Sequence, residues 1–224
     1  MVAKTNRSDQ TKKKIINAAI KLIEENGYSH VSIRDICKES GVSLSRINYH
    51  FGNKDNLAVE LAIQIPLKIN DEINRRHPGY NAPRSMESDL AFIMLMIKVL
   101  LSEGENIEKY RELYSQDAVL EHISESSRFS YQDYYSEEFR KSLTPQMLII
   151  ISSACAQCMA TILKKGNLST MQNNIENTTS AVCEFIMNLV KIPKTEQEQI
   201  MKKTHELVDD IKFEVEGITE ISFS

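Results

Sequence analysis

Residues 32–54 read SIRDICKESGVSLSRINYHFGNK, and this stretch decides how the N-terminal part of the chain folds. Ser32 and Asp35 have the spacing of a capping box, in which a hydroxyl and a carboxylate satisfy the free N–H groups at the start of a helix. The helix that follows ends before Gly41, since glycine adopts the left-handed turn conformation without strain. The apolar face of this short helix consists of Ile33, Ile36 and Cys37.

A second short helix is predicted directly after the glycine. Val42 is the apolar residue of the turn, and Ser43 is a good N-cap for a helix that runs to about His50. Ile47 and Phe51 face inward at four-residue spacing. Two short helices joined by a glycine turn form the helix-turn-helix geometry that places its second helix in the DNA major groove. Such helix pairs also occur in proteins that do not bind DNA.

The residues around the two helices make the pattern more specific, and there the chain resembles the TetR family of transcription regulators. The resemblance covers about residues 10–60 and implies an all-helical homodimer that binds operator DNA. The matching residues are Ala18, Ala19, Leu22, Gly27, Ser32, Ile33, Arg34, Asp35, Ile36, Gly41, Val42, Ser43, Asn48, Tyr49, His50, Phe51, Gly52, Asn53, Lys54 and Leu57.

The resemblance implies that four donor side chains lie at or near the phosphate backbone. Lys54 supports this, because a cation in the first turn of a helix opposes the helix dipole and needs another reason to be there. A solvated surface lysine is the alternative reading. For Lys12, Lys13 and Lys14, phosphate contact and a solvated face are equally supported. The four implied phosphate contacts are Ser43, Tyr49, His50 and Lys54.

Base reading is expected from Leu44, Ser45 and Arg46, early in the second helix. Arg46 could bind the O6 and N7 atoms of guanine or clamp a phosphate, and the sequence leaves both roles open. Ser45 and Asn48 differ from the residues frequent in the family, so the operator sequence of a relative cannot be assumed for this chain. The full expected DNA-binding set is Ser32, Ser43, Leu44, Ser45, Arg46, Asn48, Tyr49, His50 and Lys54.

The charge distribution agrees with a DNA-binding N-terminal part, although the net charge of the chain is −4. Residues 1–54 hold 10 of the 27 Lys and Arg residues but only 5 of the 31 Asp and Glu residues. A basic N-terminal part on an acidic remainder confines the attraction for DNA to one end of the molecule.

The chain is predicted to be all-α, with a helix-turn-helix domain at 1–53 and a larger ligand-binding and dimerisation domain at 54–224. Residues 1–7 are expected to form a loose arm, and Glu216–Ser224 a frayed end. One long helix over 54–76 would be kinked at Pro66, which removes a backbone donor. The other helices are expected at about 8–26, 86–103, 106–114, 117–126, 131–142, 145–165, 170–191 and 194–213.

The C-terminal domain is expected to dimerise and to bind a small molecule. Met147–Leu163 is apolar almost all round and carries a stripe of small residues, which suits a subunit interface. Its neighbour repeats the pattern with Ile175, Thr179, Val182, Ile186 and Leu189. The resemblance implies a ligand cavity, although plain core explains the same residues. Its proposed lining is Met94, Tyr110, Arg111, Tyr114, Phe129 and Tyr134.

Four cysteines raise the question of a metal or redox site. Cys155 and Cys158 lie within one predicted helix, and Cys37 and Cys183 are in unrelated contexts, so packing is favoured over metal binding. No metal, cofactor or catalytic constellation is expected, and the chain is not predicted to be an enzyme. The sequence shows no signal peptide or membrane span, so a cytoplasmic location is expected.

Two questions stay open at this point. The DNA-binding unit could have lost its activity, which would leave a ligand-sensing or adaptor protein without DNA binding. Pro66 could be the flexing point through which a small-molecule inducer releases the operator, or it could be a fixed kink. Repression is the commoner implication of the resemblance.

Overall fold

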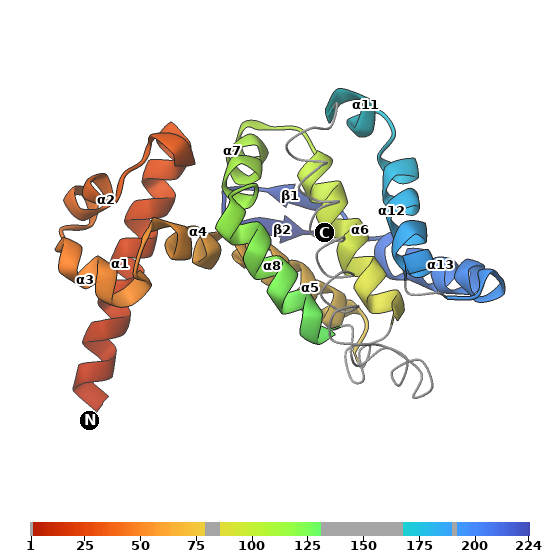
Figure 1. Cartoon of the computed structure of the whole chain (residues 1–224), viewed down its shortest axis with the longest axis horizontal. Coiled ribbons are helices and arrows are strands. Elements are labelled where there is room, and N and C mark those ends of the chain that lie inside the picture. The colour runs from red at the N-terminus through yellow and green to blue at the C-terminus, as the bar shows by residue number, and fades with distance from the viewer. Residues whose placement is uncertain (1, 79–85, 131–167, 190–191) are drawn as a thin grey trace.

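The computed structural model describes residues 2–78, 86–130, 168–189 and 192–224, and these are almost entirely helical (Figure 1). The predicted all-α fold is confirmed, apart from one small C-terminal hairpin. The helices expected at 131–142 and 145–165 lie outside the described residues. The elements are α1 (Val2–Asn26), the 3-10 turn η1 (Tyr28–His30), α2 (Ile33–Ser40), α3 (Leu44–Phe51), α4 (Lys54–Ala62), α5 (Gln64–Arg76), α6 (Met86–Leu101), α7 (Glu105–Tyr114), α8 (Asp117–Ser130), α11 (Leu168–Gln172), α12 (Ile175–Leu189), α13 (Lys194–Val208), β1 (Phe213–Val215) and β2 (Ile221–Phe223).

The first helix is longer than predicted. α1 begins at Val2, so the loose arm expected over residues 1–7 is wrong from the second residue onward. No glycine or proline interrupts this polar stretch, and adding residues to a helix that has already formed is much easier than starting one. The apolar stripe of the helix is buried, with Ile15, Ala19 and Ile23 inside the core.

The predicted helix over 54–76 is two helices, α4 and α5, separated at Ile63. Pro66 lies in the first turn of α5, where a missing N–H is tolerated because no residue of the same helix needs it. In an unbroken helix the N–H of residue 66 would donate to the carbonyl of Ala62. The buried hydroxyl of Tyr110, on α7, donates to that carbonyl instead, at 3.1 Å. A side chain of α7 therefore caps the break that the proline makes.

We expect Tyr110→Phe to lower the free energy of unfolding by about 1–3 kcal/mol, because the buried Ala62 carbonyl then lacks a donor. Replacing Pro66 by alanine restores a backbone N–H four residues after Ala62. The double variant Pro66→Ala/Tyr110→Phe should therefore recover part of the loss. Denaturant unfolding of all four proteins measures the coupling. Simple additivity of the two single changes would show that the hydroxyl does not replace the missing N–H.

α6 is the central helix of the body, the part of the chain from α5 onward (Figure 1). It packs against α5, α7, α12 and α13, and it is buried on nearly every side. The helix expected over 170–191 is broken into α11 and α12, and α13 ends at Val208, earlier than predicted. None of the helices in the described ranges is long and apolar enough to cross a membrane.

A buried carboxylate holds the end of α5. Glu72 is only 7% exposed and accepts hydrogen bonds from Arg75 at 2.6 and 2.7 Å and from Arg76 at 2.6 Å. The hydrogen bonds from Arg75, with those from Arg76, outweigh burial and lower the pKa of Glu72 from 4.5 to about 2. Arg76 also donates to the carbonyl of Asp210 at 3.2 Å, which ties α5 to the segment before the hairpin.

This carboxylate should give the protein part of its acid sensitivity. Because the folded pKa of Glu72 is lowered, its stabilisation is complete above pH 4.5 and is lost as the pH falls toward 2. Glu72→Gln should remove on the order of 2 kcal/mol of pH-dependent stability over this range. Urea unfolding at pH 3 and pH 6 measures it, with the exposed Glu206→Gln as the control. An equal loss in wild type and Glu72→Gln would contradict the assignment.

The C-terminal end is an ordered β-hairpin, so both the frayed end and the absence of strands were predicted wrongly. Its antiparallel register pairs Phe213 with Phe223 and Val215 with Ile221. These apolar residues alternate with polar ones, which is the pattern of a strand with one face on a core. The turn between the strands buries Ile218 completely, so the hairpin is packed against the body.

Candidate nucleic-acid interface

Two buried residues fix which face of α3 points away from the molecule. Ile47 is fully buried and Phe51 is 6% exposed, as predicted from their spacing. The opposite face is solvent-exposed, with Tyr49 at 82% and Leu44 at 47%. The polar residues of this outer face, also exposed, are Ser45, Arg46 and Asn48. α3 therefore presents a mixed polar and apolar surface of the kind that can contact base edges and phosphates.

Local hydrogen bonds hold the two helices of the motif in place. The capping box at α2 is present, because Ser32 accepts from Asp35 N at 3.2 Å and Asp35 accepts from Ser32 N at 3.0 Å. These hydrogen bonds lower the pKa of Asp35. Gly41 has a φ of 65°, the left-handed conformation predicted for it. Ser40, which the sequence did not single out, accepts from Val42 N at 3.2 Å and closes the turn.

Ser43 occupies the N-cap position of α3, but its side chain makes no capping hydrogen bond. Its hydroxyl lies 3.1 Å from the hydroxyl of Ser45 instead, so Ser43 takes the predicted N-cap position but its side chain does not cap the helix. The two hydroxyls face solvent together at the start of the helix. Asn53, in contrast, caps α4 and accepts from Asn56 N at 2.8 Å.

Lys54 makes contacts within the chain that the sequence did not reveal. Its ammonium donates to the carbonyl of Tyr28 at 2.7 Å and lies 3.8 Å from the centre of the tyrosine ring. Burial lowers the pKa of Lys54, while Asp55 and Glu112 act in the opposite direction. An ammonium carries three N–H donors, so two stay available after the bond to Tyr28. The contact fixes where this charge lies at the edge of the motif.

Tyr28 is held from a second side by Glu112, on α7. The carboxylate of Glu112 accepts from Tyr28 N at 3.0 Å and from Ser29 N at 2.8 Å. Burial raises the pKa of Glu112, but the hydrogen bonds from Ser29 and Tyr28 and the nearby His30 outweigh it, and the net shift is downward. Glu112 stands 83 residues from Ser29 in the chain, and no local sequence pattern signals the pairing.

The remaining expected phosphate-facing groups differ in how they are placed. Tyr49 and His50 meet edge to face, with ring centres 5.3 Å apart, and His50 is half-buried. Lys12 forms an ion pair with Glu60 at 2.7 Å, which joins α1 to α4. Lys13 and Lys14 are exposed.

The cysteines within the described residues are a packing feature. Cys37 is half-buried against the core, and Cys183 is fully buried. Burial raises the pKa of Cys183 to about 12, so its thiol is neutral and unreactive at physiological pH. Cys155 and Cys158 lie outside the described residues. Within the described residues no cluster of three or more His, Cys, Asp or Glu side chains could hold a metal ion.

The expected ligand-binding residues are spread over α6 to α8 and beyond. Met94 and Tyr110 are fully buried, and Tyr114 is nearly so, with its ring centre 5.6 Å from that of Tyr110. Arg111 donates to the carbonyls of Leu100 and Ser102 at 3.1 and 2.9 Å. Phe129 belongs to α8, but its side chain, like all of Tyr134, lies outside the described part of the structure.

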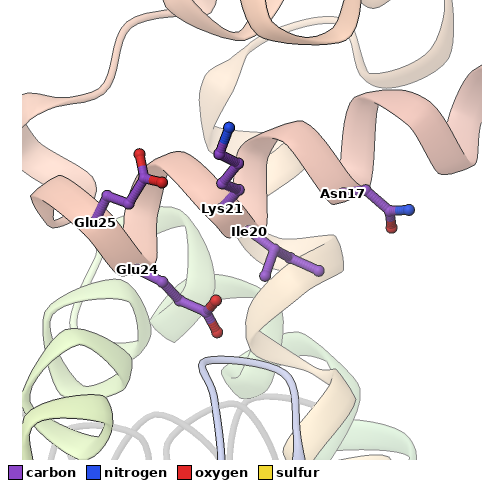
Figure 2. A pocket seen from close by; sticks show the side chains of 5 residues that line it. All are labelled: Asn17, Ile20, Lys21, Glu24 and Glu25. Atoms are coloured by element: carbon purple, nitrogen blue, oxygen red, sulfur yellow. The ribbon is translucent and has the colours of Figure 1, made fainter.

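Among the hollows lined by described residues, two have volumes of roughly 320–330 Å³, and neither includes a residue predicted to line the ligand site. The first runs along α1 and is shown in Figure 2; the second lies between α12 and α13. The hollow on α1 is lined by Asn17, Ile20, Lys21, Glu24 and Glu25.

The N-terminal part of the chain matches a known family. Residues 15–61 match the family described as bacterial regulatory proteins, tetR family, and this span contains the whole helix-turn-helix. Its DNA-binding region is that of the TetR family. The family and the fold predicted from the sequence are therefore confirmed, and the comparisons favour a DNA-binding regulator over an adaptor without DNA binding.

Two curated relatives align with part of the chain. The fatty acid metabolism regulator protein of Bacillus subtilis (strain 168) is 27% identical over 107 residues, which are 48% of this chain and 54% of that protein. The HTH-type transcriptional regulator BetI 1 of Chromohalobacter salexigens is 32% identical over 74 residues, 33% of this chain and 37% of that protein. The chain thus spans about half, or less, of the length of these relatives.

Solved TetR structures align over more of the chain. The TetR regulator TylP of Streptomyces fradiae is 18% identical, covers 90% of this chain and 99% of its own, and has a TM-score of 0.47. The TetR family repressor AlkX of Dietzia sp. is also 18% identical, covers 79% of this chain and 95% of its own, and has a TM-score of 0.48.

Proposed function

We propose that this TetR-family protein represses transcription by binding a palindromic operator as a homodimer, and that a small molecule releases it. The observation that carries the proposal is the outer face of α3. The Arg46 side chain is exposed on that face, and its guanidinium makes no hydrogen bond or ion pair with any other described residue. A free guanidinium on an exposed recognition helix is suited to bind guanine or phosphate.

The edges of the motif supply the phosphate contacts in this proposal. Tyr49 and the Ser43–Ser45 hydroxyl pair are exposed donors on either end of α3. Lys54 is held by Tyr28 with two N–H donors to spare, so it can reach a phosphate without losing its intramolecular bond. The remaining members of the proposed DNA-binding set are Ser32, Leu44, Asn48 and His50.

Dimerisation follows from the DNA geometry, because two recognition helices must reach grooves about 34–36 Å apart. The proposed interface helix, Met147–Leu163, lies outside the described residues. On α12, Thr179 and Ile186 are buried inside the protomer, which argues against the subunit contact predicted for them. Phe185 is 42% exposed on another face of α12 and is a candidate for that contact.

The effector site is proposed in the body, around α6 and α7. Met94, Tyr110 and Tyr114 form a buried, largely apolar group there, which suits an apolar or irregular ligand. Tyr110 also caps the break between α4 and α5, so a ligand that competes for its hydroxyl would act directly on the connection to the DNA-binding helices.

Selection of bound genomic fragments, followed by affinity measurements at several salt concentrations, tests the proposal. A dimer with six to ten phosphate contacts should lose about 10³-fold or more in affinity between 50 and 200 mM salt. Sedimentation of the complex should show two chains per DNA site. If no genomic fragment binds even at low salt, the repressor proposal fails and the adaptor reading takes its place.

A further inference from the structure

Two carboxylates connect the DNA-binding head, which comprises α1, η1, α2 and α3, to the rest of the chain. Glu112, on α7, accepts the N–H groups of Tyr28 and Ser29 in η1, at 3.0 and 2.8 Å. Glu24, near the end of α1, accepts the N–H of Ile218 in the hairpin turn at 3.0 Å. In each case a carboxylate of one part accepts a backbone N–H of the other part. These hydrogen bonds therefore form only when the two backbone segments lie in the correct relative position.

A glycine opposes each of these carboxylates. A Cβ at Gly27 would lie 2.8 Å from a Glu112 carboxylate oxygen, and the φ of 79° there also favours glycine. A Cβ at Gly217 would collide with a Glu24 carboxylate oxygen. In both cases the close atom is the end of a flexible glutamate side chain, so a larger residue at either glycine would displace the carboxylate from its present position rather than move the backbone.

The hairpin that receives Glu24 is itself attached to the body. Lys68, on α5, donates to the carbonyl of Thr219 at 3.0 Å, and Asn106, on α7, donates to that of Glu216 at 2.8 Å. Lys109, also on α7, donates to the backbone carbonyl of Glu24. Figure 2 shows the Glu24 side chain directed toward the hairpin, whereas Lys21 and Glu25 point away from it. The end of α1 is thus held between α7 and the hairpin.

We propose that Glu24 and Glu112 are positioning residues for operator binding, which with the C-terminal hairpin set the orientation of α3 relative to the body. α4 alone joins the head to the body along the chain, and a single helical connection permits rotation. Two further attachments at the end of α1 and at η1 oppose that rotation. The inference rests on the proposed function, because only a dimer with two DNA-reading heads has a half-site separation to be set.

Operators with altered spacing between half-sites test the orientation directly. For Glu24→Ala, Glu112→Ala and Gly217→Ala, the preference for the native spacing over a spacing changed by one base pair should fall by about 5-fold. The exposed neighbours Glu25→Ala and Glu108→Ala are matched controls and should keep the wild-type preference. Glu24→Gln keeps an oxygen acceptor for Ile218 and should also behave as wild type. An unchanged preference in the three test variants would overturn the proposal.

Hydrogen exchange on the full DNA-free chain provides a readout that does not depend on operator binding. If the two attachments act together, Glu112→Ala should reduce the protection of the Ile218 amide, and Glu24→Ala that of the Tyr28 and Ser29 amides. Changes confined to the amides whose own acceptor was removed would overturn the linkage. Failure of the wild-type chain to bind any DNA would overturn the proposed function, while the exchange result would still decide whether the head and the hairpin are coupled.

Discussion

Arg46→Ala should weaken binding to the selected DNA fragment by about 10- to 100-fold and leave thermal unfolding unchanged. The side chain is exposed and has no partner among the described residues, so its removal leaves no group inside the protein unsatisfied. Fluorescence anisotropy with labelled DNA measures the affinity. Lys202→Ala, which removes an exposed charge on α13 far along the chain, is the control for a general charge effect.

The same variant decides between the two roles open to Arg46. If the guanidinium binds guanine, Arg46→Ala should relax the preference at one position of each half-site and change the salt dependence little. If it clamps a phosphate, binding should weaken equally on all sequences, and the slope of affinity against salt should fall by about one. An affinity equal to wild type would remove Arg46 from the interface.

Ile47→Ala should lower the free energy of unfolding by about 2–5 kcal/mol. Ile47 is fully buried where α3 packs against the other helices of the head, and its truncation leaves a cavity. Leu44→Ala, one turn earlier and 47% exposed, should change stability by no more than about 0.5 kcal/mol. DNA affinity should fall in both proteins, but for different reasons. In Ile47→Ala the helix is no longer held, and in Leu44→Ala a contact surface is lost.

Thermal unfolding by circular dichroism, together with anisotropy at a temperature where both variants are folded, separates these effects. The reverse pattern, with a stable Ile47→Ala protein and an unstable Leu44→Ala protein, would mean that α3 presents its other face. That outcome would contradict the placement of Ser45, Arg46 and Tyr49 on the DNA side.

The helix-turn-helix could be predicted from the sequence because its determinants are local. The capping pair Ser32 and Asp35, the turn residue Gly41 and the inward Ile47 all act within a few residues of one another. Short-range rules of capping and periodicity therefore suffice there. The family match over residues 15–61 covers the same region, so the family resemblance and the local structure agree there.

The connections between the head and the body could not be predicted in the same way. Glu112 and Ser29 are 83 residues apart, and Glu24 and Ile218 are 194 apart, so no local pattern links them. At the break near Ile63, the hydroxyl of Tyr110 donates to the carbonyl of Ala62, which lies 48 residues away in the chain. The C-terminal hairpin, in contrast, could have been predicted. Apolar and polar residues alternate after Lys212, which is a strand pattern, but a frayed end was expected there.

The account depends most on the outer face of α3 lying against base pairs, and photo-crosslinking of the unmodified protein tests this directly. The selected operator, with thymines replaced by 5-iodouracil, is crosslinked by light, and the attached peptides are identified by mass spectrometry. We predict crosslinks within residues 44–50, in two half-sites about one helical turn apart. Binding accompanied by crosslinks only to residues 86–224 of the body would contradict the central claim.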